Sequence, residues 1–239
     1  MIDPLDGIDL VIFDKDGTLI GFDTMWRDWV DGLGDRLSDD LGRDIRPSLY
    51  LALGFDDETG AALPGGALAA TPMARLREMT VAVVVACGWS RAEAGRAVER
   101  AWFTPDPVEH AHPLGDLPNL FGRLRHDGHR IAVATSDDRT PTLQTLEWLG
   151  LASLVDAIVC ADDGLPVKPA PDMVLHVCEH LGVDPLRTAM IGDSPADLRM
   201  ARSAGAGRVI GVLTGVGERD DLEPLADLVI GSVEQLRIA

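Results

Sequence analysis

The chain has 239 residues, of which 46% are hydrophobic and 25% are charged. These proportions are typical of globular proteins and exclude a disordered or collagen-like chain. Acidic residues outnumber basic residues by 39 to 21, which gives a formal net charge of −18. Because such a surface repels nucleic acid and anionic membranes, we expect neither as a partner.

The sequence also predicts a cytoplasmic protein, present as a monomer or a homodimer. Its three cysteines are far apart and form no CxxC motif, which is typical of reduced, buried thiols. The first six residues carry a net negative charge, from Asp3 and Asp6, and lack the basic start and apolar core of a signal peptide. The longest apolar stretch, Val81–Cys87, is far too short to span a bilayer.

The first predicted strand is the apolar run Ile8–Asp14, and a long helical insert follows it. Residues 21–112 contain no convincing strand, and residues 56–70 are rich in glycine and proline, which predicts a loop. Helical patterns cover three segments of the insert, Phe22–Leu41, Thr71–Val85 and Ser90–Phe103. The last of these opens with the capping box Ser90-x-x-Glu93.

After the insert, strand-like runs alternate with amphipathic helices. The predicted strands are Arg130–Ser136, Ala157–Cys160, Thr188–Asp193 and Arg208–Leu213. The predicted helices begin at Thr140, Pro171 and Ser194 and end near Gly150, Gly182 and Gly205. Continuous apolar runs suit strands that are covered on both faces. This alternation predicts an α/β fold with a doubly wound (Rossmann-like) parallel sheet, formed by residues 1–20 and 113–239 and interrupted by a helical cap domain, 21–112.

Polar side chains stand where these predicted strands end. In open α/β sheets, ligands bind at the carboxyl ends of the strands, so we expect these side chains to converge at one edge. Several carboxylates this close together need a cation, and Mg²⁺ is the expected one. Only two lysines occur in the chain, and both fall in these segments. The candidate residues are Asp14, Asp16, Thr135, Ser136, Lys168 and Asp193.

These motifs resemble the signature of the haloacid dehalogenase superfamily of phosphohydrolases, in the branch with a helical cap after the first strand. The signature consists of DxDGT, a strand-end Thr or Ser, a Lys, and GDxxxD. The corresponding residues here are Asp14–Thr18, Thr135, Lys168 and Gly192–Asp197, in the right order. In length and cap placement the chain is most similar to the phosphoglycolate phosphatase-like branch.

The resemblance implies a Mg²⁺-dependent phosphatase that hydrolyses a small phosphorylated metabolite, phosphoglycolate-like or a sugar phosphate. Asp14 would attack phosphorus and form an aspartyl-phosphate. Asp16 would protonate the leaving group and then accept a proton from water. Mg²⁺ would bind Asp14, the backbone carbonyl of Asp16, and Asp193.

The resemblance also implies which groups hold the phosphoryl group. Thr135 and Ser136 would bind its oxygens, and Lys168 would pair with its charge and with Asp14. Asp197 would support the metal or Lys168. Because Asp197 is also three residues after Ser194, a helix-capping box explains it equally well, and the two interpretations are compatible.

Other functions fit part of this pattern. A receiver-like signalling phospho-acceptor also uses strand-end Asp, Thr and Lys around Mg²⁺, but it needs neither Asp16 nor a cap. A phosphomutase of the same superfamily stays open. Dehalogenases of the superfamily lack the second aspartate, and phosphonate hydrolases need a cap lysine that residues 21–112 lack. A calcium loop of the EF-hand type needs a Glu where Met25 stands, and a serine esterase around Ser194 lacks a DxxH segment.

Two further expectations concern Lys15 and the cap. Alternation along the first strand turns Lys15 away from Asp14 and Asp16, so we expect it to be structural. The cap is expected to close over the sheet as a lid, hinged near Gly21 and His112–Gly115, and to select the substrate. Its candidate residues for contacting a substrate carboxylate are Arg27, Arg43 and Arg46.

Overall fold

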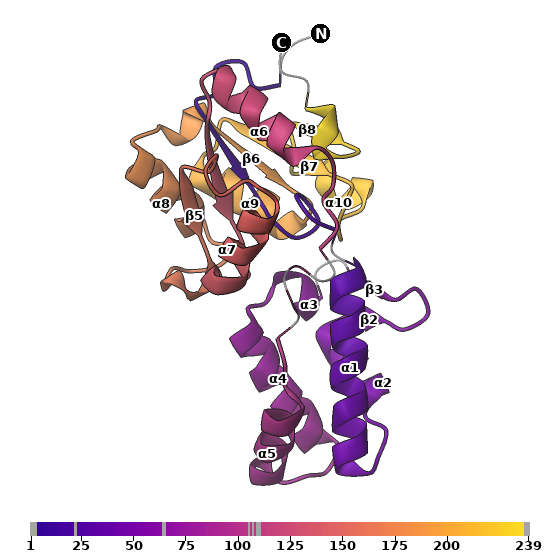
Figure 1. Cartoon of the computed structure of the whole chain (residues 1–239). Coiled ribbons are helices and arrows are strands. Elements are labelled where there is room, and N and C mark those ends of the chain that lie inside the picture. Colours follow the sequence, from indigo (N-terminus) through magenta and orange to yellow (C-terminus); the bar gives the residue numbers. More distant parts are fainter. Residues whose placement is uncertain are drawn as a thin grey trace. The chain divides into compact units, whose positions relative to one another are not determined.

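The computed structural model describes residues 4–21, 23–63, 66–104, 106, 108 and 111–236. The chain forms two compact units, one made of Met1–Phe22 and Pro107–Ala239 and the other of Asp23–Asp106 (Figure 1). The sequence pattern puts the corresponding breaks at 20/21 and 112/113. No helix within the described ranges is long and apolar enough to cross a membrane.

The first unit contains a six-stranded sheet, which confirms the predicted parallel α/β core. The strands run in the order β5-β4-β1-β6-β7-β8, and every neighbouring pair is parallel. All the predicted strands are present, and β8 is an addition that the sequence did not reveal. The bounds are β1 Leu10–Phe13, β4 Arg130–Ala134, β5 Ala157–Val159, β6 Thr188–Gly192, β7 Arg208–Val212 and β8 Leu228–Ile230.

Helices flank this sheet, and the predicted capping signals mark several of their ends. Gly182 and Gly205 terminate α8 and α9 with left-handed backbones, at φ of 64° and 75°. Ser194 opens α9 through a reciprocal pair of hydrogen bonds with Asp197. The helices of this unit are α6 Leu117–His126, α7 Arg139–Trp148, α8 Asp172–Leu181, α9 Pro195–Ala204 and α10 Arg219–Leu222, with 3-10 turns at Ala161–Asp163, Pro185–Arg187 and Val233–Gln235.

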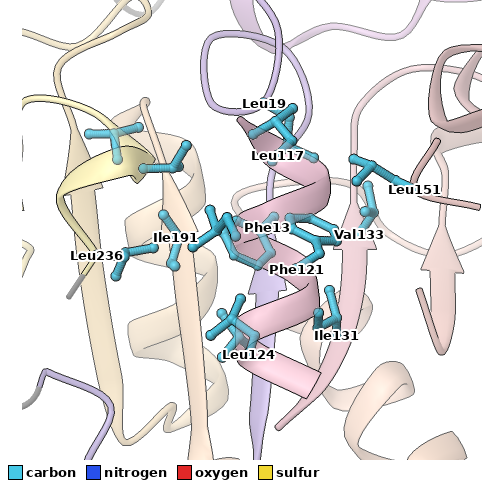
Figure 2. Packing of buried hydrophobic residues seen from close by; sticks show 14 of the residues in the cluster. Phe13, Leu19, Leu117, Phe121, Leu124, Ile131, Val133, Leu151, Ile191 and Leu236 are labelled. Carbon is cyan, nitrogen blue, oxygen red and sulfur yellow. The ribbon is translucent and has the colours of Figure 1, made fainter. Parts of the chain in front are cut away.

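Hydrophobic side chains on the two faces of the sheet form two separate cores. On one face, Val11 and Phe13 of β1 pack with α6, and the rings of Phe13 and Phe121 stack with their centroids 4.9 Å apart (Figure 2). On the other face, Leu10 and Ile12 pack with residues of α8 and α9. Because both faces of β1 are covered, its sequence is apolar throughout.

The position of β1 decides where a ligand site is expected. The chain adds β4 and β5 on one side of β1 and then β6, β7 and β8 on the other side. Phe13 is level with Val133 of β4 and with Ile191 of β6. Ligands of open α/β sheets bind beyond the carboxyl ends of the strands, where the strand order reverses. The loops that follow β1, β4 and β6 meet at this point.

The second unit consists mainly of helices and includes a short hairpin. β2 (Phe55–Asp56) and β3 (Ala61–Ala62) pair in antiparallel fashion, and α3 (Ala67–Ala70) follows them. The predictions of a strand-free insert and of a continuous loop over 56–70 were therefore wrong, because strands of two residues are too short to show an alternating pattern. The other helices are α1 Asp23–Leu41, α2 Arg46–Leu53, α4 Met73–Ala86 and α5 Arg91–Ala101.

Aromatic side chains hold the core of this second unit together. Trp29 is only 1% exposed, and the rings of Trp26 and Trp102 meet it edge-on at 5.5 and 5.3 Å between centroids. Its indole nitrogen donates to the carbonyl oxygen of Phe103 at 2.7 Å. These contacts join α1 to the segment after α5, so the ends of the insert are tied to each other.

Candidate active site

The loop after β1 begins with Asp14, whose side chain is buried. The amide nitrogen of Asp14 donates to the carbonyl oxygen of Ile191 at 2.9 Å, so this residue is still fixed beside β6. The backbone then turns tightly, and the amides of Leu19 and Ile20 both donate to the carbonyl oxygen of Lys15. Gly17 has a φ of 84°, a left-handed conformation that side chains disfavour. The DxDGT segment is thus a compact turn at the carboxyl edge of the sheet.

Lys168 and two aspartates form a buried cluster of opposite charges. The ammonium of Lys168 donates to Asp14 Oδ1 and lies 2.6 Å from Asp197 Oδ1. The side chains of Lys168, Asp14 and Asp197 are 4%, 7% and 2% exposed. The other oxygen of Asp197 accepts hydrogen bonds from the amide and hydroxyl of Ser194, at 3.1 and 2.6 Å. Asp197 therefore both caps α9 and contacts Lys168, which are the two interpretations that the sequence left open.

Asp193 follows β6 and is enclosed by the loop after β7. Its Oδ2 accepts a hydrogen bond from the amide of Val216 at 2.9 Å, and its Oδ1 lies 3.4 Å from the hydroxyl of Thr18. A Cβ on Gly215 would stand 2.0 Å from Asp193 Oδ2. The sequence motifs did not reveal the contribution of this loop, although the glycines at 215 and 217, directly after a predicted strand, are a signal of close backbone approach.

The ionisation of these carboxylates is governed by burial and by their mutual repulsion. Burial raises the pKa of Asp14 to about 7, while Lys168 opposes the rise and Asp197 adds to it. Burial, Asp14 and Asp197 also raise the pKa of Asp193 well above its usual range. Burial disfavours the ammonium of Lys168, but Asp14 and Asp197 outweigh that effect and raise its pKa. One ammonium therefore does not neutralise the three carboxylates.

Asp14, Asp193 and Asp197 form a donor set that fits a hard divalent cation. One carboxylate oxygen of each lies within 4.8 Å of the other two, and all three residues are buried. Oδ1 of Asp197 is a buried oxygen that accepts no hydrogen bond with proper geometry from the described residues. Closely spaced carboxylate oxygens with surplus negative charge are the environment that Mg²⁺ prefers. The ligands expected from the sequence were Asp14, the Asp16 carbonyl and Asp193, and the structure adds Asp197 as a carboxylate within reach.

Thr135 and Ser136 lie where β4 ends. The amide of Thr135 donates to the carbonyl oxygen of Val159 at 3.0 Å, so the residue is fixed to β5, and its side chain is buried. Its hydroxyl oxygen accepts a hydrogen bond from the amide of Asp137 at 3.1 Å. Ser136, next along the same loop, is half-buried. The loop after β4 thus brings two hydroxyl groups to the edge that also carries Asp14.

Lys15 does not point away from Asp16, so the expectation drawn from strand alternation was wrong for that aspartate. Its ammonium lies 2.7 Å from Asp16 Oδ1 and 3.2 Å from Asp137 Oδ2. The alternation rule fails because β1 ends at Phe13, and the backbone has already left the strand at Lys15. Asp137 was not among the predicted site residues, although its place directly after Ser136 is a usable signal.

The fold and the site together define an α/β enzyme that gathers carboxylates and lysines at the carboxyl ends of its strands. The family described as haloacid dehalogenase-like hydrolase matches residues 8–205. The chain belongs to this family, and the resemblance seen in its motifs is confirmed.

Relatives within and near this family support the assignment. A phosphoglycolate phosphatase of Rhodospirillum rubrum is 31% identical over 208 residues, which cover 84% of this chain and 78% of that protein. The probable phosphatase IndB of Dickeya dadantii is 39% identical over 107 residues, which span only 46% of its length and 45% of this chain. The crystal structure of a phosphatase from Thermococcus onnurineus superposes with a TM-score of 0.68 at 23% identity, covering 96% of each chain, which shows the shared fold.

Proposed function

We propose that this protein is a Mg²⁺-dependent phosphatase that hydrolyses a small phosphomonoester through an aspartyl-phosphate on Asp14. The observation that carries the proposal is the buried cluster in which Lys168 contacts Asp14 and Asp197 beside Asp193. A nucleophilic carboxylate, a fixed cation and surplus carboxylate oxygens at one strand edge are what phosphoryl transfer requires. Membership of the hydrolase family and the names of its phosphatase relatives agree with this chemistry.

The proposed reaction has two displacement steps. A carboxylate oxygen of Asp14 attacks phosphorus while the bond from phosphorus to the alcohol oxygen breaks, and Asp16 donates its proton to that oxygen. Water then attacks phosphorus and gives a proton to Asp16, while the bond from phosphorus to Asp14 breaks. The products are the alcohol and inorganic phosphate, and Asp16 is again protonated.

The groups around Asp14 have distinct proposed tasks. Lys168, fixed by Asp14 and Asp197, pairs with the phosphoryl charge, and the hydroxyls of Thr135 and Ser136 donate to the phosphoryl oxygens. The carboxylates of Asp14 and Asp193 and the backbone carbonyl of Asp16 would hold Mg²⁺, with Asp197 supporting them. When bound, Mg²⁺ supplies positive charge that offsets the repulsion between a carboxylate and a phosphate dianion.

We assign the choice of alcohol to the helical second unit, acting as a lid, and we propose a phosphoglycolate-like or sugar phosphate substrate. Among its three candidate arginines, Arg43 already donates to the carbonyl of Cys87 at 3.0 Å, and Arg46 pairs with Asp44 at 2.9 Å. Arg27, at the start of α1, packs over Gly60 and is exposed. We therefore expect Arg27→Ala to lower kcat/KM for the natural ester more than for an aryl phosphate.

The decisive experiment measures hydrolysis of p-nitrophenyl phosphate together with labelling of Asp14. We expect activity that EDTA abolishes and Mg²⁺ restores, and an Asp14→Asn variant that loses at least ~10³-fold in kcat. Asp9→Asn, which changes an exposed carboxyl at the other end of β1, serves as the control and should keep its activity. A phosphate label on Asp14 that hydroxylamine removes supports the covalent step. Normal turnover by Asp14→Asn would refute it, and a stable label without turnover would favour a receiver-like phospho-acceptor.

A further inference from the structure

We infer that Lys15 is a positioning residue that fixes the general acid Asp16, with Asp137 as its anchor. This inference deepens the proposed function and rests on it, because it assigns a role in the hydrolytic site to the residue at the x position of the DxDGT motif. The geometry that carries it is a single buried ammonium, 1% exposed, between two carboxylates from different loops. The first loop follows β1 and the second follows β4.

Asp137 is held in place by hydrogen bonds that do not involve Lys15. Its amide donates to the hydroxyl oxygen of Thr135 at 3.1 Å, and its carbonyl oxygen accepts from the amide of Ala161 at 3.0 Å. One carboxylate oxygen accepts from the amide of Asp138 at 2.8 Å, and the other lies 3.2 Å from the ammonium of Lys15. The anchor therefore belongs to the same rigid loop that presents the phosphate-binding hydroxyls.

Lys15 transmits this fixed position to Asp16. Its ammonium donates to Oδ1 of Asp16 at 2.7 Å, while Oδ2 of Asp16 accepts no hydrogen bond from any residue that the structure describes. The side chain of Asp16 is 13% exposed, so it keeps a route to a ligand that Lys15 lacks. One oxygen of Asp16 is thus held in place, and the other remains available to exchange a proton with the leaving group.

A lysine suits this task better than the arginine that the chain uses elsewhere. An ammonium is a compact charge that can face two carboxylates at once, whereas a guanidinium is planar and larger. A buried, unpaired ammonium is costly, so Lys15 is stable there only while its carboxylate partners stay in contact. Asp16 is consequently held near one position, and the cost of orienting it is met before substrate binds.

The inference predicts a specific kinetic signature. A general acid matters most for alcohols that leave poorly, and little for acidic phenols that leave without a proton. We expect Lys15→Met to lower kcat/KM by at most about three-fold for the aryl phosphate whose phenol is the most acidic of the series. For the ester of the least acidic phenol, the expected decrease in kcat/KM is ~10–100-fold. Asp16→Asn should show the same trend more steeply. Adding Lys15→Met to Asp16→Asn should cost little more, because both changes disable one device.

The experiment therefore compares kcat/KM across the series for wild type, the single variants and the double variant. Arg187→Met removes a paired cation at the opposite edge of the sheet, where Arg187 contacts Asp9, and it should leave the dependence on the leaving group unchanged. Lys15→Arg should recover part of the loss seen in Lys15→Met. If Lys15→Met does not fold, Asp137→Asn provides the reading, and it should show the same trend in weaker form.

The outcomes separate the inference from the function on which it rests. If Asp16→Asn steepens the dependence on the leaving group but Lys15→Met and Asp137→Asn lower all substrates equally, Lys15 is merely structural and the inference fails alone. Full additivity of Lys15→Met and Asp16→Asn would also overturn it. If Asp16→Asn leaves the dependence unchanged, or wild type hydrolyses none of the esters, the proposed function fails and the inference falls with it.

Discussion

Gly215→Ala tests whether the loop after β7 shapes the cation site. A Cβ at this position would stand 2.0 Å from Asp193 Oδ2 and 2.8 Å from Asp193 Cβ, whereas real Cβ atoms essentially never come closer than 3.0 Å. The contact at Cβ is with the base of the side chain, so a rotation of the carboxylate alone does not relieve the clash. We expect the carboxylate of Asp193 to move by about 1 Å, which is the difference between the 2.0 Å approach to Oδ2 and the 3.0 Å limit.

A displacement of this size matters more for metal binding than for folding. Overpacking a dense site costs roughly 1–3 kcal/mol of stability. Metal ligands, in contrast, must lie within about 0.2 Å of their proper distance, and misplacement of a catalytic group by about 1 Å costs on the order of 10²-fold in rate. We therefore expect Gly215→Ala to fold, to need a much higher Mg²⁺ concentration for half-maximal activity, and to lose ~10²-fold in kcat.

The assay combines thermal unfolding with Mg²⁺ titration, both by activity and by calorimetry of the metal alone. Gly122→Ala is the matched control, because its Cβ would meet nothing within 4 Å and its place in α6 favours alanine. We expect that control to be as stable as wild type or up to ~1 kcal/mol more stable, with unchanged Mg²⁺ affinity. Equal Mg²⁺ affinity of Gly215→Ala and Gly122→Ala would refute the argument that Gly215 makes room for a ligating carboxylate.

Three further predictions follow from other contacts. Ser194→Ala should lower the free energy of unfolding in urea by about 1 kcal/mol, because it removes the cap of α9. It should also lower kcat, because Asp197 loses its 2.6 Å hydrogen bond. A loss of stability with an unchanged kcat would contradict the role of this hydrogen bond in catalysis. The Arg139 hydrogen bonds lower the pKa of Asp163 below 3.8, so this group contributes stability above that pH and loses it as the pH falls through the folded-state pKa. Asp163→Asn should therefore have a lower Tm than wild type at pH 7 and the same Tm as wild type at strongly acidic pH. A difference in Tm that does not change with pH would contradict this prediction. Ca²⁺ should inhibit the Mg²⁺-activated enzyme, because its longer and more variable bonds disturb the geometry of displacement; activation by Ca²⁺ in a titration at fixed substrate would contradict this.

The sheet was predictable because the burial of its strands is written into short stretches of sequence. Ile12 and Phe13 face opposite cores, so β1 reads as a continuous apolar run. β8 was missed because it has three residues, of which Leu228 is 38% exposed, and it is defined by pairing with β7 rather than by its own pattern. The hairpin of β2 and β3 was missed for the same reason.

The candidate site was predictable to the extent that strand ends meet at one edge. Asp14, Thr135 and Asp193 follow three adjacent parallel strands, so their proximity follows from topology alone. The contacts of Gly215 and Lys15 do not follow in this way. Gly215 contacts Asp193 because the loop after β7 folds back to the end of β6. Lys15 contacts Asp16 because β1 ends at Phe13, one residue before the end of the strand predicted from the sequence.

The two lysines divide the acidic edge into two parts with different charge balances. Lys168 contacts Asp14 and Asp197 beside Asp193, so one ammonium faces three buried carboxylates. Among the residues that the structure describes, Lys15 pairs with Asp16 and Asp137, and both of these are partly exposed. Surplus negative charge is more costly where burial is deeper, so a divalent cation gains most on the side of Lys168. The carboxyl group of Asp16 contacts the ammonium of Lys15 through Oδ1, and only its backbone carbonyl is proposed to reach the cation, so Oδ2 stays available for the proposed proton transfer.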